Sequence, residues 1–319
     1  MIADELLERV RAGGLIEPPA PLVAMLSGGR DSVCLLDLAV RARGSEAVAA
    51  AHVNYGLRDD ADADERFCAE LCDRLGVELA VERPRRPEGP GNLQAWARDS
   101  RYAAAAALAL PREATIVTGH TADDQVETIL YRLASSPSRR ALLGMRPHDG
   151  RLARPLLGTT REEVTAYCER RGLAWREDRS NADPAFARSR VRHGLLPELA
   201  RVHPAAAANV LRTAELLRDE AEVLDGLVDA ELDGSAETPR GTIGLPRLAE
   251  LPPALRRLVV QRLADRAAGR PVAGAARHAE AVTALRRTGV ARLDLGGGVR
   301  AVVERGVLRA ECGEQRPDI

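Results

Sequence analysis

A run of small, hydroxylated and charged residues near the amino terminus has the composition of a phosphate-binding loop, and it reads Ser27-Gly28-Gly29-Arg30-Asp31-Ser32. It follows the apolar run 22–26 and precedes the helical pattern 33–40, which predicts strand, tight turn and helix. Adjacent glycines let backbone N–H groups approach an anion, and the helix start adds free donors and a positive dipole end. We expect a nucleotide phosphate here; an ordinary glycine-rich turn is the alternative.

The basic residues narrow the class of nucleotide enzyme. The chain contains no lysine, so all 46 basic residues are arginine. This excludes a Walker P-loop, the strand lysine of a kinase and a pyridoxal-phosphate Schiff base. The pattern Ser-Gly-Gly-x-Asp-Ser instead resembles the loop of the PP-loop ATP pyrophosphatases, which split ATP between the α and β phosphates. The resemblance implies an adenylated intermediate.

A second polar segment, Thr118–Thr128, brings carboxylates into the first turn of a predicted helix. Asp123 and Glu127 share a face by their i,i+4 spacing, and Asp124 is adjacent. Acidic residues here complement the helix dipole, and they are also suitable oxygen ligands for Mg²⁺. A magnesium ion would neutralise charge on the departing pyrophosphate. His120 alone is more typical of a hydrogen-bonded loop histidine.

The first half of the chain alternates predicted strands and helices. We expect strands at 22–26, 47–53, 77–81 and 114–118, and helices at 33–43, 59–75, 93–108 and from 121 onward. Such alternation predicts a doubly wound parallel sheet in an α/β fold. Ligands bind beyond the carboxyl ends of such strands, where the loops 27–32, 54–58 and 119–128 all fall.

The rest of the chain predicts a helical linker and a small second domain. Short strands at 151–157 and 173–175 are expected around a helix at 160–171, and the pattern is helical over 204–232. A turn-rich segment follows at 233–241, and then two helical patterns, Gly296-Gly297-Gly298 and two short strands. The predicted domains are 1–200, 201–240 and 241–319, the last being α/β or α+β.

Charge and cysteine content indicate which partners and which cellular compartment the protein is suited to. The net charge is −1, but residues 131–203 hold 15 arginines against 8 acidic residues, while 59–73 is acidic. A basic face for a polyanion is one interpretation, and solvated helix faces are the alternative. Five cysteines without any C-x-x-C favour a reducing cytoplasm. No signal peptide or membrane span is expected.

Several motifs in the same order resemble the tRNA(Ile)-lysidine synthetase family. They are SGGRDS at 27–32, HVNYGLR at 52–58, ARDSRY at 97–102, TGHTADDQVET at 118–128, RPLL at 154–157, TREE at 160–163, EDRSN at 177–181 and FARSRVR at 186–192. The match covers about the first 200 residues, and the last third matches loosely. The resemblance implies an adenine-nucleotide alpha-hydrolase-like fold.

The resemblance also implies an activity. In this family ATP adenylates the C2 oxygen of the wobble cytidine of an isoleucine tRNA with a CAU anticodon, and the amine of free L-lysine then displaces AMP. The chemistry needs a pyrophosphate cradle, Mg²⁺ and alignment of three substrates rather than a protein nucleophile. A homodimer is also implied, and the terminal unit would hold the tRNA acceptor stem or elbow.

Residues enter the predicted site by their match to these motifs. The catalytic candidates are Asp31, Asp124 and Arg98. The nucleotide-binding candidates are Ser27, Gly28, Gly29, Arg30, Asp31, Ser32, His52, Asn54 and Gly56. The metal candidates are Asp31, Asp123, Asp124 and Glu127. The tRNA-binding candidates are Arg58, Arg101, Tyr102, Arg188, Arg190 and Arg192.

The sequence departs from the family pattern at several positions. Histidines are expected where Tyr55 and Thr121 stand, asparagine where Ser189 stands, and a glycine-rich loop at 135–140. Tyr55 does not exchange a proton near neutrality, and Thr121 fits a helix N-cap. These changes keep a non-catalytic nucleotide or RNA-binding module as an alternative. A PP-loop tRNA thiolase is disfavoured by the cysteine pattern, and an amidating ligase by the lack of a visible partner domain.

Overall fold

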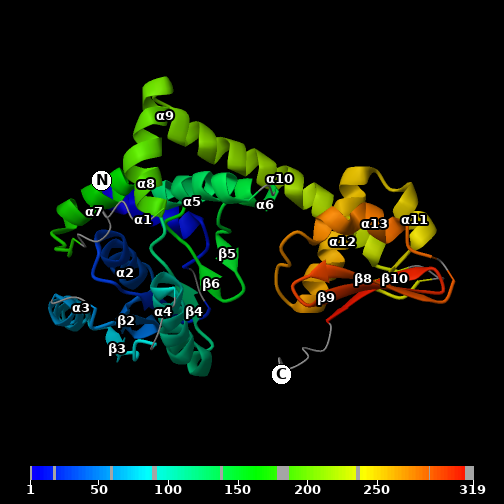
Figure 1. Ribbon diagram of the computed structural model, residues 1–319. Coiled ribbons are helices and arrows are strands. Elements are labelled where there is room, and N and C mark those ends of the chain that lie inside the picture. Colours follow the sequence, from blue (N-terminus) through cyan, green and yellow to red (C-terminus); the bar gives the residue numbers. More distant parts are fainter. Residues whose placement is uncertain are drawn as a thin grey trace. The chain divides into compact units, whose positions relative to one another are not determined.

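The computed structural model describes the chain at residues 2–16, 19–57, 60–87, 92–136, 139–177, 187–234, 238–286 and 288–312. It divides into two compact units, residues 1–215 and 216–319, each with its own sheet (Figure 1). The boundary between the units falls inside the long helix α10 (Ala206–Leu232). None of the described helices has the length and apolar character needed to cross a bilayer.

The first unit is built on a six-stranded sheet in the order β3-β2-β1-β4-β6-β5. The strands are β1 Leu22–Met25, β2 Val48–Val53, β3 Glu78–Glu82, β4 Thr115–Val117, β5 His148–Asp149 and β6 Leu152–Ala153. All neighbours run parallel except β5, which pairs antiparallel with β6 at the edge. The predicted doubly wound parallel sheet is confirmed, with an antiparallel edge strand that the alternation of elements did not indicate.

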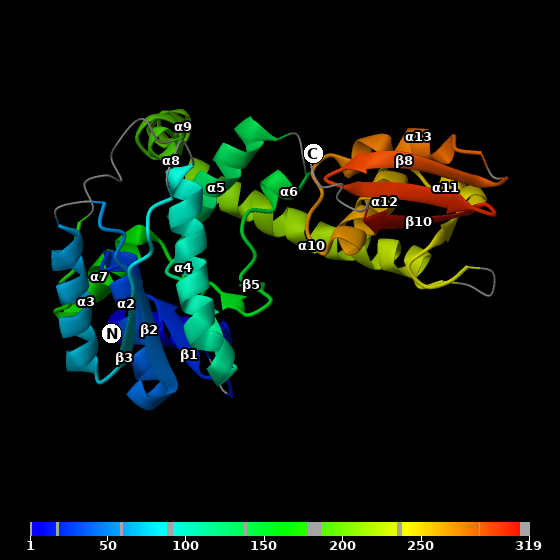
Figure 2. The same cartoon turned by 60° about the horizontal axis from the view of Figure 1, so that its bottom comes forward.

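Helices cover both faces of this sheet, as Figures 1 and 2 show for α2 and α4. The helices are α1 Ile2–Ala12, α2 Arg30–Arg43, α3 Ala61–Leu75, α4 Leu93–Ala109, α5 Ala122–Ser135, α6 Arg139–Leu142, α7 Arg161–Arg171, α8 Ala187–Arg190 and α9 Leu196–Val202. A π-helical turn, Val191–Leu195, joins α8 to α9. The helices predicted at 33–43, 59–75, 93–108 and 160–171 are confirmed within a few residues at their ends.

The pleat of the strands explains why two cores form. Successive side chains of a strand point to opposite faces of the sheet. Leu22 and Ala24 therefore pack into the core shared with α1, α2, α3 and α7, whereas Val23 packs into the smaller core beneath α4. Because small alanines fill much of the second core, α4 lies close against β1 and β2.

A buried ionic contact fixes the helices on the first face. Asp37 of α2, 1% exposed, accepts hydrogen bonds from Arg171 and from the hydroxyl of Tyr167, both on α7. Arg41 in turn donates to the Tyr167 hydroxyl at 3.3 Å. A buried carboxylate is tolerated only when it is paired in this way, so these contacts hold α2 and α7 in register.

One strand prediction is wrong. Residues 173–175 form no ladder with any described strand. Their backbone is engaged elsewhere: the N–H of Leu173 closes the end of α7 on Cys168, and the N–H of Arg176 donates to the carbonyl of Gly28 at 2.9 Å. The apolar side chains 173 and 175 instead pack on the first core. This segment therefore buttresses the predicted phosphate loop rather than extending the sheet.

The second unit has a four-stranded antiparallel sheet in the order β7-β10-β9-β8. Its elements are β7 Ile243–Gly244, α11 Leu245–Glu250, α12 Pro253–Ala268, α13 Ala279–Thr283, β8 Val290–Gly296, β9 Val299–Glu304 and β10 Val307–Cys312. Gly296, Gly297 and Gly298 all have positive φ where β8 turns into β9, a conformation that favours glycine. The predicted small α+β unit is thereby confirmed, with four strands.

Candidate active site

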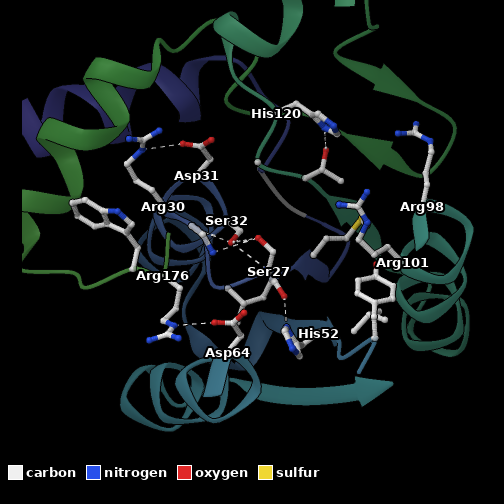
Figure 3. Close-up of a pocket in the computed structure, with 18 of the residues that line it drawn as sticks. Ser27, Arg30, Asp31, Ser32, His52, Asp64, Arg98, Arg101, His120 and Arg176 are labelled. Carbon is white, nitrogen blue, oxygen red and sulfur yellow. Dashed lines mark hydrogen bonds and ion pairs between the residues drawn. The ribbon is translucent and has the colours of Figure 1, made fainter. Parts of the chain in front are cut away.

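A cavity of about 960 Å³ opens at the carboxyl ends of β1, β2 and β4 (Figure 3). Its wall includes residues of the loops 27–32, 52–57 and 118–120, together with the first part of α4. The sequence predicted that these loops would converge at this edge of the sheet, and the structure brings them together. The cavity therefore contains most of the predicted site residues.

The phosphate loop joins β1 to α2 through a network of serine hydroxyls. Gly28 has φ +80°, and a Cβ on it would lie 3.3 Å from the sulfur of Cys68, so the turn and its packing both favour glycine. The Ser32 hydroxyl donates to the Gly29 carbonyl at 2.8 Å and accepts from the Ser27 N–H at 3.2 Å. No side chain caps α2 at Gly29. The predicted strand, turn and helix are confirmed, and nucleotide binding stays a prediction.

Asp31 lies in the first turn of α2 with its side chain 26% exposed. Burial raises the pKa of its carboxyl, the guanidinium of Arg30 opposes that shift, and the negative charge of Asp124 adds to it. Arg30 donates to Asp31 at 3.2 Å. Two carboxylates from different elements thus lie close enough to repel each other, an arrangement that a divalent cation would stabilise.

The carboxylates of α5 are held by a helix cap and two arginines. Thr121 caps α5: its N–H donates to Asp124 at 2.9 Å, and its hydroxyl accepts from the Asp124 N–H at 3.4 Å. Asp123 accepts from the backbone N–H of Arg161 at 2.7 Å. Glu127, 2% exposed, accepts from Arg192 through both oxygens, at 2.6 and 3.2 Å. The predicted N-cap at Thr121 is confirmed.

These contacts decide which carboxylates fit Mg²⁺. The two arginines, Arg161 and Arg192, also lie 3.5 Å from one oxygen of Asp124. Within the described ranges no three His, Cys, Asp or Glu side chains form a metal-binding group. Magnesium, however, is held in proteins by one or two carboxylates together with substrate phosphates. Asp31 lines the cavity and fits that role. Asp124, beside it, would exchange its 3.5 Å contacts with the two arginines for the metal, whereas Asp123 and Glu127 are engaged more tightly by α7 and by Arg192.

Of the predicted residues at the end of β2 and in the loop after it, His52 and Asn54 line the cavity. His52 is 4% exposed, its Nδ1 lies 2.9 Å from the carbonyl oxygen of Leu26, and its Nε2 has no partner. Asn54 donates to Asp62 and Glu65 of α3 and accepts from the N–H of Gly56. Asn54 therefore organises its own loop.

The predicted residues Arg98, Arg101 and Tyr102 of α4 all line the cavity. The guanidinium of Arg98 lies over the Tyr102 ring, 4.8 Å from its centroid. Tyr55, where the family pattern has histidine, packs edge-on against Trp96 and donates to the Ala97 carbonyl at 2.7 Å. Burial raises the pKa of Tyr55. Tyr55 is therefore a packing residue.

The three arginines around α8 do not behave alike. Arg188 is exposed and its nearest polar contact is the Thr128 hydroxyl at 3.5 Å. Arg190 is exposed as well. Arg192, which lies in the π-helical turn after α8, pairs with Glu127 and Asp124. Arg192 is thus part of the carboxylate network. Arg58 lies outside the described residues.

Three residues that are important to the site were not among the predicted site residues. A Cβ on Gly119 would lie 2.8 Å from the carbonyl oxygen of Asp31, so β4 and the phosphate loop touch through backbone atoms. Arg161 joins three carboxylates, and Arg176 pairs with Asp64 at 2.8 Å across the cavity wall. Only Gly119, a glycine directly after a strand, carried a recognisable cue for close backbone approach.

Comparisons with known proteins bear on this site. Residues 6–199 match the family model of the PP-loop domain. The tRNA(Ile)-lysidine synthase of Thermus thermophilus is 40% identical over 266 residues, 81% of this chain and 51% of that protein. The tRNA(Ile)-lysidine synthase of an Azoarcus species is 41% identical over 245 residues, 74% of this chain and 53% of that protein. The chain spans about half the length of the curated relatives it matches.

A solved structure shows the same fold. The U34-tRNA thiolase NcsA from Methanococcus maripaludis, solved with its 4Fe-4S cluster, aligns with a TM-score of 0.57 over 68% of this chain and 79% of that one. The two sequences are 18% identical. At this identity the likeness concerns the arrangement of the sheet and helices alone.

Proposed function

The chain belongs to the tRNA(Ile)-lysidine synthase family, and from that premise we propose that it ligates lysine to the wobble cytidine of a CAU-anticodon isoleucine tRNA at the expense of ATP. The observation that carries this proposal is the cavity lined by the phosphate loop and Asp31, with the carboxylate of Asp124 close enough to act on Asp31. A reaction that joins a nucleotide, a base and an amine needs such a shared enclosure.

The reaction has two steps. The C2 oxygen of the cytidine attacks the α-phosphorus of ATP, and the bond to the β-phosphate oxygen breaks, releasing pyrophosphate. The ε-amine of lysine then attacks C2, the bond from C2 to the adenylate oxygen breaks, and AMP leaves while the amine loses a proton. Each step transfers charge onto a phosphate leaving group, so stabilisation of that charge is the main task of the protein.

The residues of the cavity divide this task. The backbone of residues 27–32 and the start of α2 would bind the pyrophosphate. Asp31 and Asp124 would hold Mg²⁺, which supplies charge neutralisation on the departing phosphates. Arg98 lies on the opposite wall, where its fixed charge would act on the adenylate. A carboxylate oxygen of this pair that does not contact the metal would orient the lysine amine.

The alternatives are weaker on physical grounds. A thiolase that uses cysteine chemistry needs a thiol of low pKa, whereas burial raises the pKa of Cys68 and of Cys72 to about 12. A binding module without catalysis would not need Asp31 and Asp124 close together at a cost in electrostatic repulsion. A homodimer, which the family resemblance implies, and a cytoplasmic location, which the cysteine pattern favours, stay predictions.

A labelling assay tests the proposal. The purified chain is incubated with ATP, Mg²⁺, radiolabelled lysine and a transcript of the CAU-anticodon isoleucine tRNA, and acid-precipitable label is counted. We expect incorporation of label that depends on ATP and that disappears when uridine replaces cytidine at the wobble position. Asp31→Asn should lower the rate by at least about 100-fold, the scale of removing an electrostatic catalytic group.

The negative result is equally specific. If folded protein binds ATP and the transcript but incorporates no lysine, the proposal is wrong. A different amine, tested in the same assay with labelled ornithine or arginine, would then decide between another ligase and a binding module.

A further inference from the structure

Four arginines beside the cavity have no acidic partner among the residues that the structure describes. We call them the arginine cluster, and its members are Arg98, Arg132, Arg154 and Arg188. Their described contacts are neutral: Arg132 donates to the Gly144 carbonyl at 2.7 Å, Arg154 to the Arg146 carbonyl at 2.6 Å, and Arg188 to the Thr128 hydroxyl at 3.5 Å. Arg98 rests on the Tyr102 ring.

Other arginines of the cavity wall are different. Arg30 pairs with Asp31, Arg176 with Asp64, and Arg192 with Glu127. Among the described residues, these three arginines of the wall therefore have carboxylate partners, whereas the arginine cluster, of which only Arg98 lines the cavity, has none. Buried or crowded charges are normally compensated by a charge of opposite sign. The arginine cluster departs from this rule within the described residues.

The contacts also place the cluster in one region. Thr128 and Arg132 are one turn apart on α5, so Arg188, which contacts Thr128, lies beside Arg132. Arg132 and Arg154 both donate to the same short loop, at Gly144 and Arg146. Arg98 joins them at the cavity wall next to His120 (Figure 3).

Burial and the crowding of positive charge lower the pKa of two neighbouring groups. Burial first, and then the charges of Arg188, Arg154 and Arg98, lower the pKa of Arg132. The same three charges, added to burial, hold the pKa of His120 at about 4 despite the opposing carboxylate of Asp124. Arg154 is only 6% exposed, and its Nε has no hydrogen-bond partner. Such a site is destabilised until an anion enters it.

We propose that the arginine cluster binds a backbone phosphodiester of the RNA substrate next to the nucleotide cavity. The inference rests on the proposed function for the identity of the RNA. A phosphodiester fits better than the carboxylate of a free amino acid for two reasons. Arg98 and Arg188 are exposed, so a polymer can reach them, and guanidinium forks match the geometry of phosphate oxygens. A group of several cations is also better matched to the repeated charges of a nucleic-acid backbone than to a single carboxylate.

RNA binding at several salt concentrations tests this proposal. The ligand is an anticodon stem-loop RNA with the CAU sequence, titrated into the full chain without ATP or lysine. We expect Arg132→Gln and Arg188→Gln each to raise Kd by about 3–10-fold and to lower the slope of log Kd against log salt by about 0.7, the loss of one phosphate contact. The same loss should appear with uridine at the wobble position. ATP affinity should change by less than about twofold, since neither residue lines the cavity.

Two controls keep the result interpretable. Arg112→Gln removes an arginine whose partner is Glu78 outside the cavity, and it should leave the salt slope unchanged. Arg154→Lys retains the charge of the buried member, and thermal unfolding should show that each variant is folded. An unchanged Kd and slope in both Arg132→Gln and Arg188→Gln would overturn the proposal, as would a loss confined to lysine affinity. Arginine-dependent RNA binding in a protein that forms no lysidine would refute the proposed function alone.

Discussion

At the scale of single residues, burial of the Asp31 carboxylate in the cavity lowers the stability of the folded protein. Burial is the largest influence on this carboxyl and raises its pKa above 3.8. A raised acid pKa means that the folded state binds more protons than the unfolded state just above pH 3.8, so stability falls as pH rises through that window. Functional carboxylates are often kept at such a cost.

We therefore predict that Asp31→Asn stabilises the ligand-free protein while it abolishes lysidine formation. The melting temperature at pH 7 should rise by about 2 °C, and the gain should shrink as pH falls toward 4. Differential scanning calorimetry across this pH range measures it.

Asp4→Asn is the matched control with the opposite sign. A hydrogen bond from Arg41 lowers the pKa of Asp4, so the charged form is the one favoured by the fold. Its removal should lower the melting temperature slightly at pH 7, with the loss disappearing at acid pH. A lower melting temperature for Asp31→Asn than for wild type would refute the interpretation of Asp31.

Residue patterns predicted some of these positions well. The serine and glycine loop and the Thr121 cap depend on neighbours within six residues, and both are where the sequence indicated. The partners of Glu127 were not predictable, because Arg161 and Arg192 are 34 and 65 residues away along the chain. Spacing along one helix carries no information about which distant side chain reaches it.

At the scale of elements, the loop after β4 and the start of α2 are held in backbone contact by Gly119. A Cβ there would meet the Asp31 carbonyl oxygen at 2.8 Å and its carbon at 2.9 Å. Neither atom belongs to a flexible side chain, so the whole turn must move. The contact sets the distance between the phosphate loop and the carboxylates of α5.

We predict that Gly119→Ala weakens ATP binding by at least about tenfold and lowers stability by about 1–3 kcal/mol, the usual cost of overpacking. Isothermal titration with ATP and Mg²⁺ measures the first effect and chemical denaturation the second. Gly158→Ala is the control, because nothing lies within 4 Å of a Cβ at that position. Equal ATP affinity in the two variants would contradict the prediction.

The order of elements was predictable because helices and strands alternate with clear apolar runs. The segment 173–175 was not, since a short apolar run pairs as readily with a core as with a sheet. Its backbone donors were claimed by the end of α7 and by Gly28. The strand predicted at 151–157 contains β6, but its antiparallel partner β5 was missed, because a two-residue strand has no periodicity from which to predict it.

At the scale of the whole molecule, the cavity belongs to one unit. Its lining residues run from Met25 to His193, all within 1–215. The second unit has a separate core, to which Val228 and Leu232 of α10 contribute. Two independent cores predict two independently stable parts.

We predict that a fragment of residues 1–215 folds and binds ATP with Mg²⁺ within about threefold of the full chain, since it keeps the complete cavity. Circular dichroism and isothermal titration are the measurements. A matched fragment carrying Asp31→Asn should fold but lose metal-dependent binding. An unfolded 1–215 fragment would show that the second unit is needed for the stability of the first.

The sequence predicted a second unit. The order of strands in its sheet could not be predicted, because β7 pairs with a strand that is distant along the chain.

The arginines of the cavity wall have a chemical consequence of their own. Arg30, Arg98, Arg101, Arg161, Arg176 and Arg192 line the cavity. The chain has no lysine, and a guanidinium stays protonated at any physiological pH, so it is not a nucleophile. A carbon made electrophilic inside this enclosure would therefore meet several fixed positive charges but no lysine amine of the wall that could compete with an incoming amine substrate.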